Sequence, residues 1–227
     1  MISNCGHDEN NRYSGGKAGD QTRTEWRVIN WYNRPWKCVL RHPDAKVRKM
    51  IASMAKAAAV NDKIGYDQSE RYTFWEHLKA SNYDPAQITI ACEADCSSGV
   101  AAIVKGAGYR LGNEKMKNVS IYLYTGNMRA GLKAAGFEVL TDSKYLTSDA
   151  YLLEGDILLN DNAHVATNLT TGSMQILMMW MLQKSHSRMY MSDGLMNIFR
   201  PSVIPTSRVI VQHGRCVINL HRCVLLM

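Results

Sequence analysis

Residues 93–100 read Glu-Ala-Asp-Cys-Ser-Ser-Gly-Val, and this stretch limits the fold more than any other. Asp95 is a favourable N-cap residue, and the Ala- and Val-rich residues 96–107 predict a buried helix that begins at Cys96. Free backbone N–H groups and the helix dipole at such a start stabilise a thiolate and lower the pKa of its cysteine. The same N–H groups can bind the oxyanion of a tetrahedral intermediate. The stretch therefore indicates either a nucleophilic cysteine or a structural cysteine at the start of a helix.

A second informative stretch covers residues 154–168, which read as a turn, a short strand, a loop and a second strand that begins at His164. A cysteine nucleophile needs a base that takes up and returns a proton, and histidine is suited to this near neutral pH. Cys96 and His164 lie far apart in the sequence, so only the fold can bring them together. A cysteine at a helix start followed by a histidine at a strand start indicates nucleophilic catalysis more specifically than either residue alone.

Hydrophobic spacing predicts the other elements of the chain. The predicted helices cover residues 45–60, 67–79, 96–107 and 127–135, and the predicted strands cover residues 25–32, 137–140, 156–159 and 164–169. Helices in the middle of the chain followed by strands predict an α+β fold. The cluster of Trp26, Trp31, Tyr32 and Trp36 is interpreted as core packing.

Composition divides the chain into a turn-rich leading segment (residues 1–45), an ordered middle part (46–172) and a tail (173–227). The tail holds eight of the 13 methionines, and its six Lys or Arg residues against one Asp give it a net charge of +5. Such a charge attracts polyanions. The tail is therefore either a small basic binding module or a segment that selection for folding did not shape.

The whole chain has 227 residues, 46% of them hydrophobic, and a net charge of +7, which predicts a soluble globular protein. No apolar run reaches the roughly 18 residues that a membrane-spanning helix needs, so we expect no membrane insertion. The first residues have neither a basic nor an apolar signal region, so we expect synthesis in the cytoplasm without a signal peptide. The six cysteines are scattered and form no Cys-x-x-Cys pair, which favours reduced thiols and no zinc ribbon.

Three motifs of the chain resemble those of a known family: Asp95-Cys96-Ser97-Ser98-Gly99, Gly155-Asp156-Ile157-Leu158 and His164-Val165. They look like the NlpC/P60 superfamily of papain-like cell-wall cysteine peptidases, and within it like endolysins of phages and prophages of Gram-positive bacteria. The resemblance covers residues 1–172, since residues 15–22 and 31–36 also resemble the leading segment of such lysins. It implies a papain-like fold with helices packed on a small antiparallel sheet. It also implies a hydrolase that cuts an amide bond of peptidoglycan without a metal or cofactor and reaches the cell wall after release from the cytoplasm.

The resemblance also implies roles for individual residues. Cys96 would be the nucleophile and His164 the general base, while Asp95 and Ser97 would line the substrate site. Tyr66 would lie near the thiolate and the oxyanion; packing of Tyr66 against a helix start is an equal alternative.

The family has a third polar residue that orients the histidine, and this chain departs from the family there. Gln175, His7, Asp20 and Gln21 are candidates for that role. Asn168 shares the face of His164, but four residues of strand span about 13 Å, beyond the reach of a hydrogen bond.

Two other functions are compatible with the sequence. The first is a non-catalytic basic protein that binds an anionic cell-wall polymer or nucleic acid through the tail. The absence of any helix-turn-helix, zinc-finger or RNP-like motif speaks against nucleic acid as a partner. The second is a metal site formed by His213, Cys216, His221 and Cys223, whose spacing matches no standard zinc module, so we expect no metal.

Overall fold

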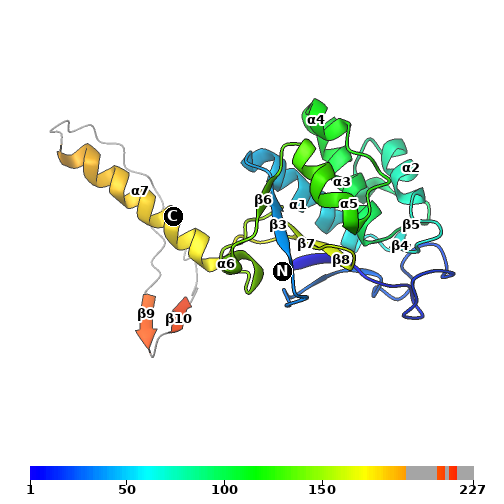
Figure 1. The fold of residues 1–227 in the computed structure, drawn as a ribbon, viewed down its shortest axis with the longest axis horizontal. Coiled ribbons are helices and arrows are strands. Elements are labelled where there is room, and N and C mark those ends of the chain that lie inside the picture. The colour runs from blue at the N-terminus through cyan, green and yellow to red at the C-terminus, as the bar shows by residue number, and fades with distance from the viewer. Residues whose placement is uncertain (193–208, 213–214, 219–227) are drawn as a thin grey trace, which may run out of the picture. The chain divides into compact units, whose positions relative to one another are not determined.

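The structure is a computed structural model that describes residues 1–192, 209–212 and 215–218. Its chain divides into two compact units, residues 1–182 and residues 183–227. The first unit combines helices with an antiparallel sheet (Figure 1), which confirms the predicted α+β class. The boundary that composition places at residue 172 stays a prediction.

The centre of the first unit is a six-stranded antiparallel sheet with the strand order β2–β1–β8–β7–β3–β6. The strands are β1 (Ile2–Cys5), β2 (Trp26–Ile29), β3 (Cys38–Arg41), β6 (Glu138–Leu140), β7 (Ile157–Asn160) and β8 (His164–Asn168). The leading segment therefore supplies three of the six strands, although its composition predicts mostly loop. β1 lies beside β8, with Ile2 opposite Asn168, so the start of the chain borders the strand that carries His164.

Six helices and a small parallel strand pair complete this unit. The helices are α1 (Ala45–Val60), α2 (Thr73–Ala80), α3 (Cys96–Leu111), α4 (Glu114–Lys117), α5 (Thr125–Ala134) and α6 (Ser143–Leu146), with a 3₁₀ turn at Pro85–Gln87. The strand pair is β4 (Ile64–Tyr66) with β5 (Cys92–Ala94). The predicted helix at residues 45–60 is confirmed, and so is the start of α3 at Cys96. α3 continues to Leu111 because Gly112 there adopts the left-handed conformation that ends helices.

The predicted helix at residues 67–79 begins too early. Asp67 does not enter a helix, because its carboxylate accepts hydrogen bonds from the backbone of Ser69 and Glu70 and forms a turn. The same carboxylate accepts bonds from the amides of Gly15 and Gly16 in the leading segment. Asp67 therefore binds the leading segment instead of starting a helix, and the helix in this stretch is α2, which begins at Thr73.

The two faces of the sheet carry different cores. Side chains such as Val165 and Ile157 pack with Trp26 and the helices on one face, where Figure 1 shows α1, α3 and α5. Ile2, Trp36 and other residues form a second cluster on the opposite face, packed against the loop after β2 and against α6. Trp26 and Trp36 are both buried, which confirms core packing for these two residues, but they lie in different cores. Trp31 and Tyr32 are half-buried against the second cluster.

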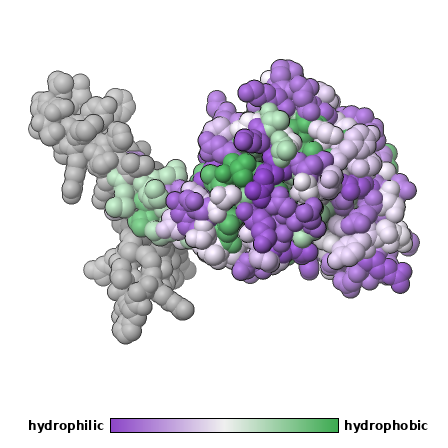
Figure 2. Space-filling view, in the orientation of Figure 1, coloured by the Kyte–Doolittle hydropathy of each residue, from purple (hydrophilic) through white to green (hydrophobic). Residues whose placement is uncertain are grey.

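The tail contains α7 (Ser173–Ser192), β9 (Val209–Gln212) and β10 (Arg215–Ile218). The start of α7 exposes large apolar side chains, which Figure 2 shows as a hydrophobic patch: Met174, Ile176, Leu177, Met178, Met179, Trp180 and Met181. Among the described residues, no helix is both long enough and apolar enough to cross a membrane.

Candidate active site

The start of α3 is fixed by an extensive cap. Asp95 Oδ1 accepts hydrogen bonds from the amides of Ser97 (3.0 Å) and Ser98 (2.7 Å), and Ser98 Oγ accepts a bond from the Asp95 amide at 2.9 Å. This reciprocal arrangement is a capping box, which satisfies amides that a helix start leaves open. The amide of Cys96 is not among those that Asp95 binds. The cap therefore presents the half-buried Cys96 thiol at the helix start beside its own amide.

Arg71, which lies before α2, binds two side chains of this cap. Its Nη1 lies 2.7 Å from Asp95 Oδ2, and its Nη2 donates a 3.0 Å hydrogen bond to Ser97 Oγ. Asp95 and Ser97 are each only 3% exposed, and their side chains bond to the cap and to Arg71. Both residues thus position Cys96. Their expected contact with a substrate stays a prediction.

His164, at the start of β8, is buried on the sheet face that carries Trp36. Its Nε2 lies 2.7 Å from Asn4 Oδ1 on the neighbouring strand β1, and its ring stacks on the Trp36 indole at a centroid distance of 6.2 Å. A carbonyl oxygen accepts but does not donate, so the contact with Asn4 requires the hydrogen on Nε2. In the neutral ring, Nδ1 then carries the lone pair that can accept a proton. The Tyr32 hydroxyl donates a further bond to Asn4 Oδ1 at 3.3 Å.

Asn4 is the functional-site residue that the sequence pattern does not reveal. The candidates for the orienting role bond elsewhere: His7 to the backbone of Asp8, Asp20 to the amides of residues 24–26, Gln21 to the backbone of Ala18 and Gly19, and Gln175 to the backbone of Tyr151. Asn168 donates to the backbone of Leu153 and Thr170, as its distance from His164 along the strand leads us to expect. Parity on β1 could have pointed to Asn4 only if the pairing of β1 with β8 were known.

The fold brings β8 and Tyr66 to the cysteine. The backbone amide of Val165, the residue after His164, is directed at the Cys96 thiol and acts to lower its pKa. Tyr66 is buried at the end of β4, where burial first and then the nearby Cys96 raise the pKa of its phenol. Its hydroxyl accepts a 3.1 Å bond from Gln68 Nε2. Cys96 and Tyr66 therefore lie near each other and near Val165 of β8, although they come from distant parts of the sequence. The His164 ring lies on the other face of the sheet, with Trp36.

Burial shifts the pKa values of both Cys96 and His164, and the shift of Cys96 is opposite to that expected at a helix start. Burial and the neighbouring Asp95 carboxylate raise the pKa of Cys96 to about 11, against the hydrogen bond from Val165 and the charge of Arg71. The predicted lowering of this pKa is thus wrong, because desolvation of the thiolate outweighs the open amides. Burial, with a contribution from Arg34, lowers the pKa of His164 to about 3. At neutral pH the resting pair is a neutral thiol and a neutral imidazole.

Residues 2–175 match a family model described as an endolysin-like domain. The chain belongs to this family. The matched region contains Cys96, His164 and Asn4, and membership in the endolysin-like domain family indicates a cell-wall lytic role. No curated protein and no solved structure matches the chain.

The endolysin-like domain contains free thiols at Cys5, Cys38, Cys92 and Cys96. Within the described residues, no group of three or more His, Cys, Asp or Glu side chains is arranged to hold a metal ion. Of the tail residues considered for a metal site, His213, His221 and Cys223 lie outside the described residues, and so does the side chain of Cys216.

Proposed function

We propose that the protein is a peptidoglycan hydrolase that cuts an amide bond of the wall peptide with Cys96 as nucleophile and His164 as general base. The observation that carries this proposal is the hydrogen bond between His164 Nε2 and Asn4, which leaves Nδ1 available for a proton; the next residue, Val165, lies near Cys96. A nucleophile at a helix start and a base that is fixed in one tautomer are two of the groups that acyl transfer requires.

The reaction begins from the neutral pair. As the sulfur attacks the amide carbon, the thiol proton passes to His164 Nδ1, so the new C–S bond and the imidazolium form together. The Cys96 amide and the Tyr66 hydroxyl are donors that stabilise the oxyanion. The imidazolium then gives its proton to the leaving nitrogen as the C–N bond breaks. Water, activated by the neutral imidazole, attacks the thioester and releases the acid and the thiol.

The same observations support an NlpC/P60 type of papain-like fold for residues 1–172. α3 packs its cysteine end against an antiparallel sheet, and the strand that begins with the histidine lies at the centre of that sheet. We propose that the enzyme belongs to a phage or prophage lysis system and acts on the cell wall after release from the cytoplasm. Wall adhesion through the tail, with its net charge of +5, is the second part of this proposal.

The test uses Gram-positive peptidoglycan, the full-length protein and its Cys96→Ala variant, with the products read by mass spectrometry. We expect new amino and carboxyl termini with the wild-type protein and none with Cys96→Ala. A matched control is Cys38→Ala, which removes another buried thiol from the same core and leaves the candidate site intact. Equal digestion by the wild type and Cys96→Ala would show that Cys96 is not the nucleophile, and no digestion by a folded wild-type protein would overturn the hydrolase proposal.

A further inference from the structure

Two exposed tyrosines flank a buried leucine in the loop between α4 and α5. Tyr122 is 65% exposed and Tyr124 is 54% exposed, whereas Leu123 between them is 6% exposed and packs in the main core. Residues 120–123 form a turn that is closed by a 3.4 Å bond from the Leu123 amide to the Ser120 carbonyl, and with Leu123 anchored in the core both aromatic rings lie outward. Large aromatic side chains that a fold holds in solvent are typical of binding surfaces.

Arg71 connects the first of these tyrosines to the nucleophile. Its Nη2 donates to Ser97 Oγ and to the Leu123 carbonyl, each at 3.0 Å, so these two oxygens are at most 6.0 Å apart. Its guanidinium also lies over the Tyr72 ring at 5.2 Å. Tyr72 in turn contacts the Tyr122 ring edge to face, with centroids 4.9 Å apart. The position of Tyr122 is therefore tied to the residue that follows Cys96.

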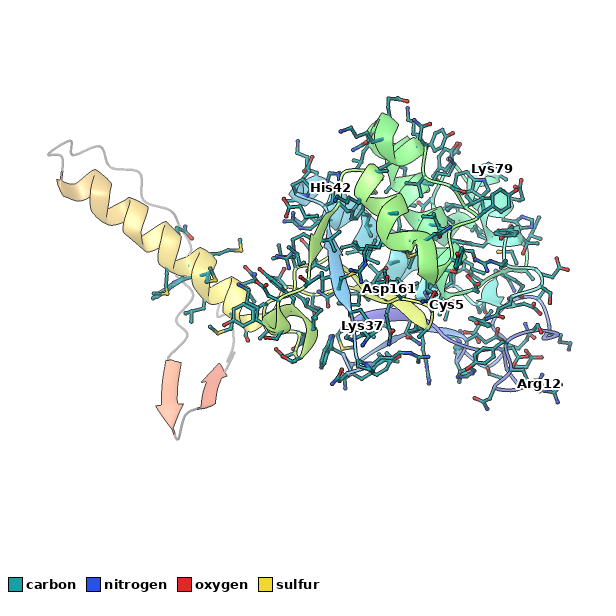
Figure 3. The ribbon with its side chains drawn as sticks, viewed as in Figure 1. Cys5, Arg12, Lys37, His42, Lys79 and Asp161 are labelled. Carbon is teal, nitrogen blue, oxygen red and sulfur yellow. The ribbon has the colours of Figure 1, made fainter. Side chains whose placement is uncertain are left out.

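Gly126 connects the second tyrosine to the histidine. A Cβ atom at this position would lie 2.6 Å from the Tyr124 ring and 2.5 Å from Asn162 Oδ1, so only glycine lets both groups lie against the start of α5. Asn162 is on the turn between β7 and β8, two residues before His164. Arg129 of α5 pairs with Asp161 on the same turn at 2.5 Å. Figure 3 labels Asp161 near the lower end of α5. Tyr124 therefore borders the hairpin that carries the candidate base.

We propose that Tyr122 and Tyr124 form a saccharide-binding subsite beside Cys96, which takes an N-acetylated sugar ring of the glycan strand. This inference rests on the proposed function, since it assumes that peptidoglycan is the substrate. The flat face of a tyrosine ring packs against the C–H groups on one face of a pyranose, and its hydroxyl can bond to the sugar hydroxyls. Wall peptides consist mainly of small and charged residues, which offer no comparable flat apolar face. The enzyme then prefers an amide whose peptide is still attached to the glycan.

The chain offers a matched control for this surface. Tyr109 is also exposed, at 41%, but it stacks on Tyr83 with centroids 4.4 Å apart. It lies 13 residues along α3 from Cys96, or about 20 Å at the rise of an α-helix. Tyr109→Ala therefore removes an exposed tyrosine without touching the proposed subsite.

The experiment compares two substrates in the full-length protein: a disaccharide-linked wall peptide and the same peptide without sugar. We expect the wild type and Tyr109→Ala to show a kcat/KM at least tenfold higher for the glycosylated substrate. The Tyr122→Ala/Tyr124→Ala variant should lose this preference through a higher KM for the glycosylated substrate, so that the two substrates are hydrolysed with similar kcat/KM. The Tyr122→Phe/Tyr124→Phe variant should keep most of the preference, because the ring faces remain.

A binding measurement separates failure of the subsite from failure of the hydrolase proposal. The inactive Cys96→Ala variant is titrated with a chitin-type N-acetylglucosamine tetramer by calorimetry, with and without the two tyrosine substitutions. Binding that the tyrosine substitutions abolish supports the subsite, even if the wild type hydrolyses nothing. Equal hydrolysis of both substrates by all tyrosine variants, or tetramer binding that the substitutions leave unchanged, would overturn the subsite while leaving the hydrolase proposal intact.

Discussion

The leading segment meets the rest of the first unit in two regions that treat buried polar groups differently. Around His164, the direct contacts of the ring are with neutral groups: Asn4 bonds to the imidazole and to the Tyr32 hydroxyl, and Trp36 covers the ring. One cation, Arg34, donates to the same Tyr32 hydroxyl. Around residues 19–25, the buried polar groups are carboxylates instead. Glu25 and Glu93 are 0% and 3% exposed, and Glu25 Oε1 and Glu93 Oε2 have no hydrogen-bond partner among the described residues.

In the acidic region, the carboxylates bind backbone amides of distant parts of the chain. Glu25 Oε2 accepts a 2.7 Å bond from the Tyr66 amide, and Glu93 Oε1 accepts a 2.5 Å bond from the Gly19 amide. A Cβ at Gly65 would lie 2.8 Å from an oxygen of each carboxylate, so a glycine is required where these groups converge. Burial is the main cause that raises the pKa of Glu25 to about 7 and that of Glu93 to about 8.

The leading segment therefore has two roles, one at the candidate base and one in holding the fold together. The neutral region orients a base without burying a charge, which suits catalysis because the ring keeps one tautomer at little cost in stability. The acidic region positions Tyr66 and the leading loop, but its carboxylates lose hydration that their partners do not fully replace. Substitution in the first region should therefore affect activity, and substitution in the second should affect stability.

The largest expected effect is on activity, from Asn4→Ala. Loss of the bond to Nε2 frees the ring to change tautomer, and we expect kcat to fall about 10²-fold, the lower end of what a positioned acid–base group contributes. KM should change little, because Asn4 binds the histidine and not the substrate in our proposal. The measurement is steady-state hydrolysis of a wall fragment between pH 5 and 9.

Asn4→Asp is the matched control for this change. It keeps an oxygen acceptor for Nε2 and should recover most of kcat, while its negative charge raises the pKa of His164 and moves the acid limb of the pH profile upward. If Asn4→Ala retains the wild-type kcat, or if Asn4→Asp leaves the pH profile unmoved, Asn4 does not position the base.

The next effect is on stability, from Glu25→Gln and Glu93→Gln. A carboxyl whose pKa is raised by folding stabilises the fold below its unfolded pKa, and that contribution is lost as the pH rises through the folded value. The wild type should therefore lose stability as the pH rises from 5 to 8. The double variant should show a flatter dependence and a higher free energy of unfolding at pH 8, measured by urea denaturation.

Gln68→Asn is a suitable control for the acidic pair, since it changes a neighbouring polar side chain that carries no charge. Its stability should follow the pH dependence of the wild type. The test is the difference in free energy of unfolding between the wild type and the double variant. If this difference is constant between pH 5 and pH 8, or increases in favour of the wild type, the pKa values of Glu25 and Glu93 are not raised.

Local signals explain what the sequence could predict of this fold. Helical spacing from Ala45 to Val60 and the cap at Asp95 depend on neighbours in the sequence, and both predictions match the structure. Cys96 and His164 were candidates because a helix start and a strand start are recognisable without tertiary information. β1 and β3 were missed because they lie in the leading segment, whose turn-rich composition predicts mostly loop.

Distant contacts explain what the sequence could not predict. Asn4 and His164 are 160 residues apart, and their contact depends on β1 pairing with β8. The pKa of Cys96 depends on burial by the whole fold, which a helix-start argument does not include. Glu93 precedes the recognisable Asp95-Cys96 motif by only two residues, yet its partner Gly19 lies in the leading segment, so the acidic region also escaped prediction.

The smallest effect, and the sharpest contrast between the two regions, concerns His164 at acidic pH. A histidine whose pKa is lowered by folding stabilises the fold above its unfolded pKa, and that contribution is lost as the pH falls toward the folded value of about 3. We expect the wild type to lose about 1–2 kcal/mol between pH 6.5 and pH 5 relative to His164→Gln, which keeps an amide donor for Asn4. His42→Gln is the control, because burial also lowers the pKa of His42, outside the candidate site. Since Glu25 and Glu93 stabilise the fold over the same fall in pH, the two regions should give slopes of opposite sign. Slopes of the same sign would show that folding does not lower the pKa of His164.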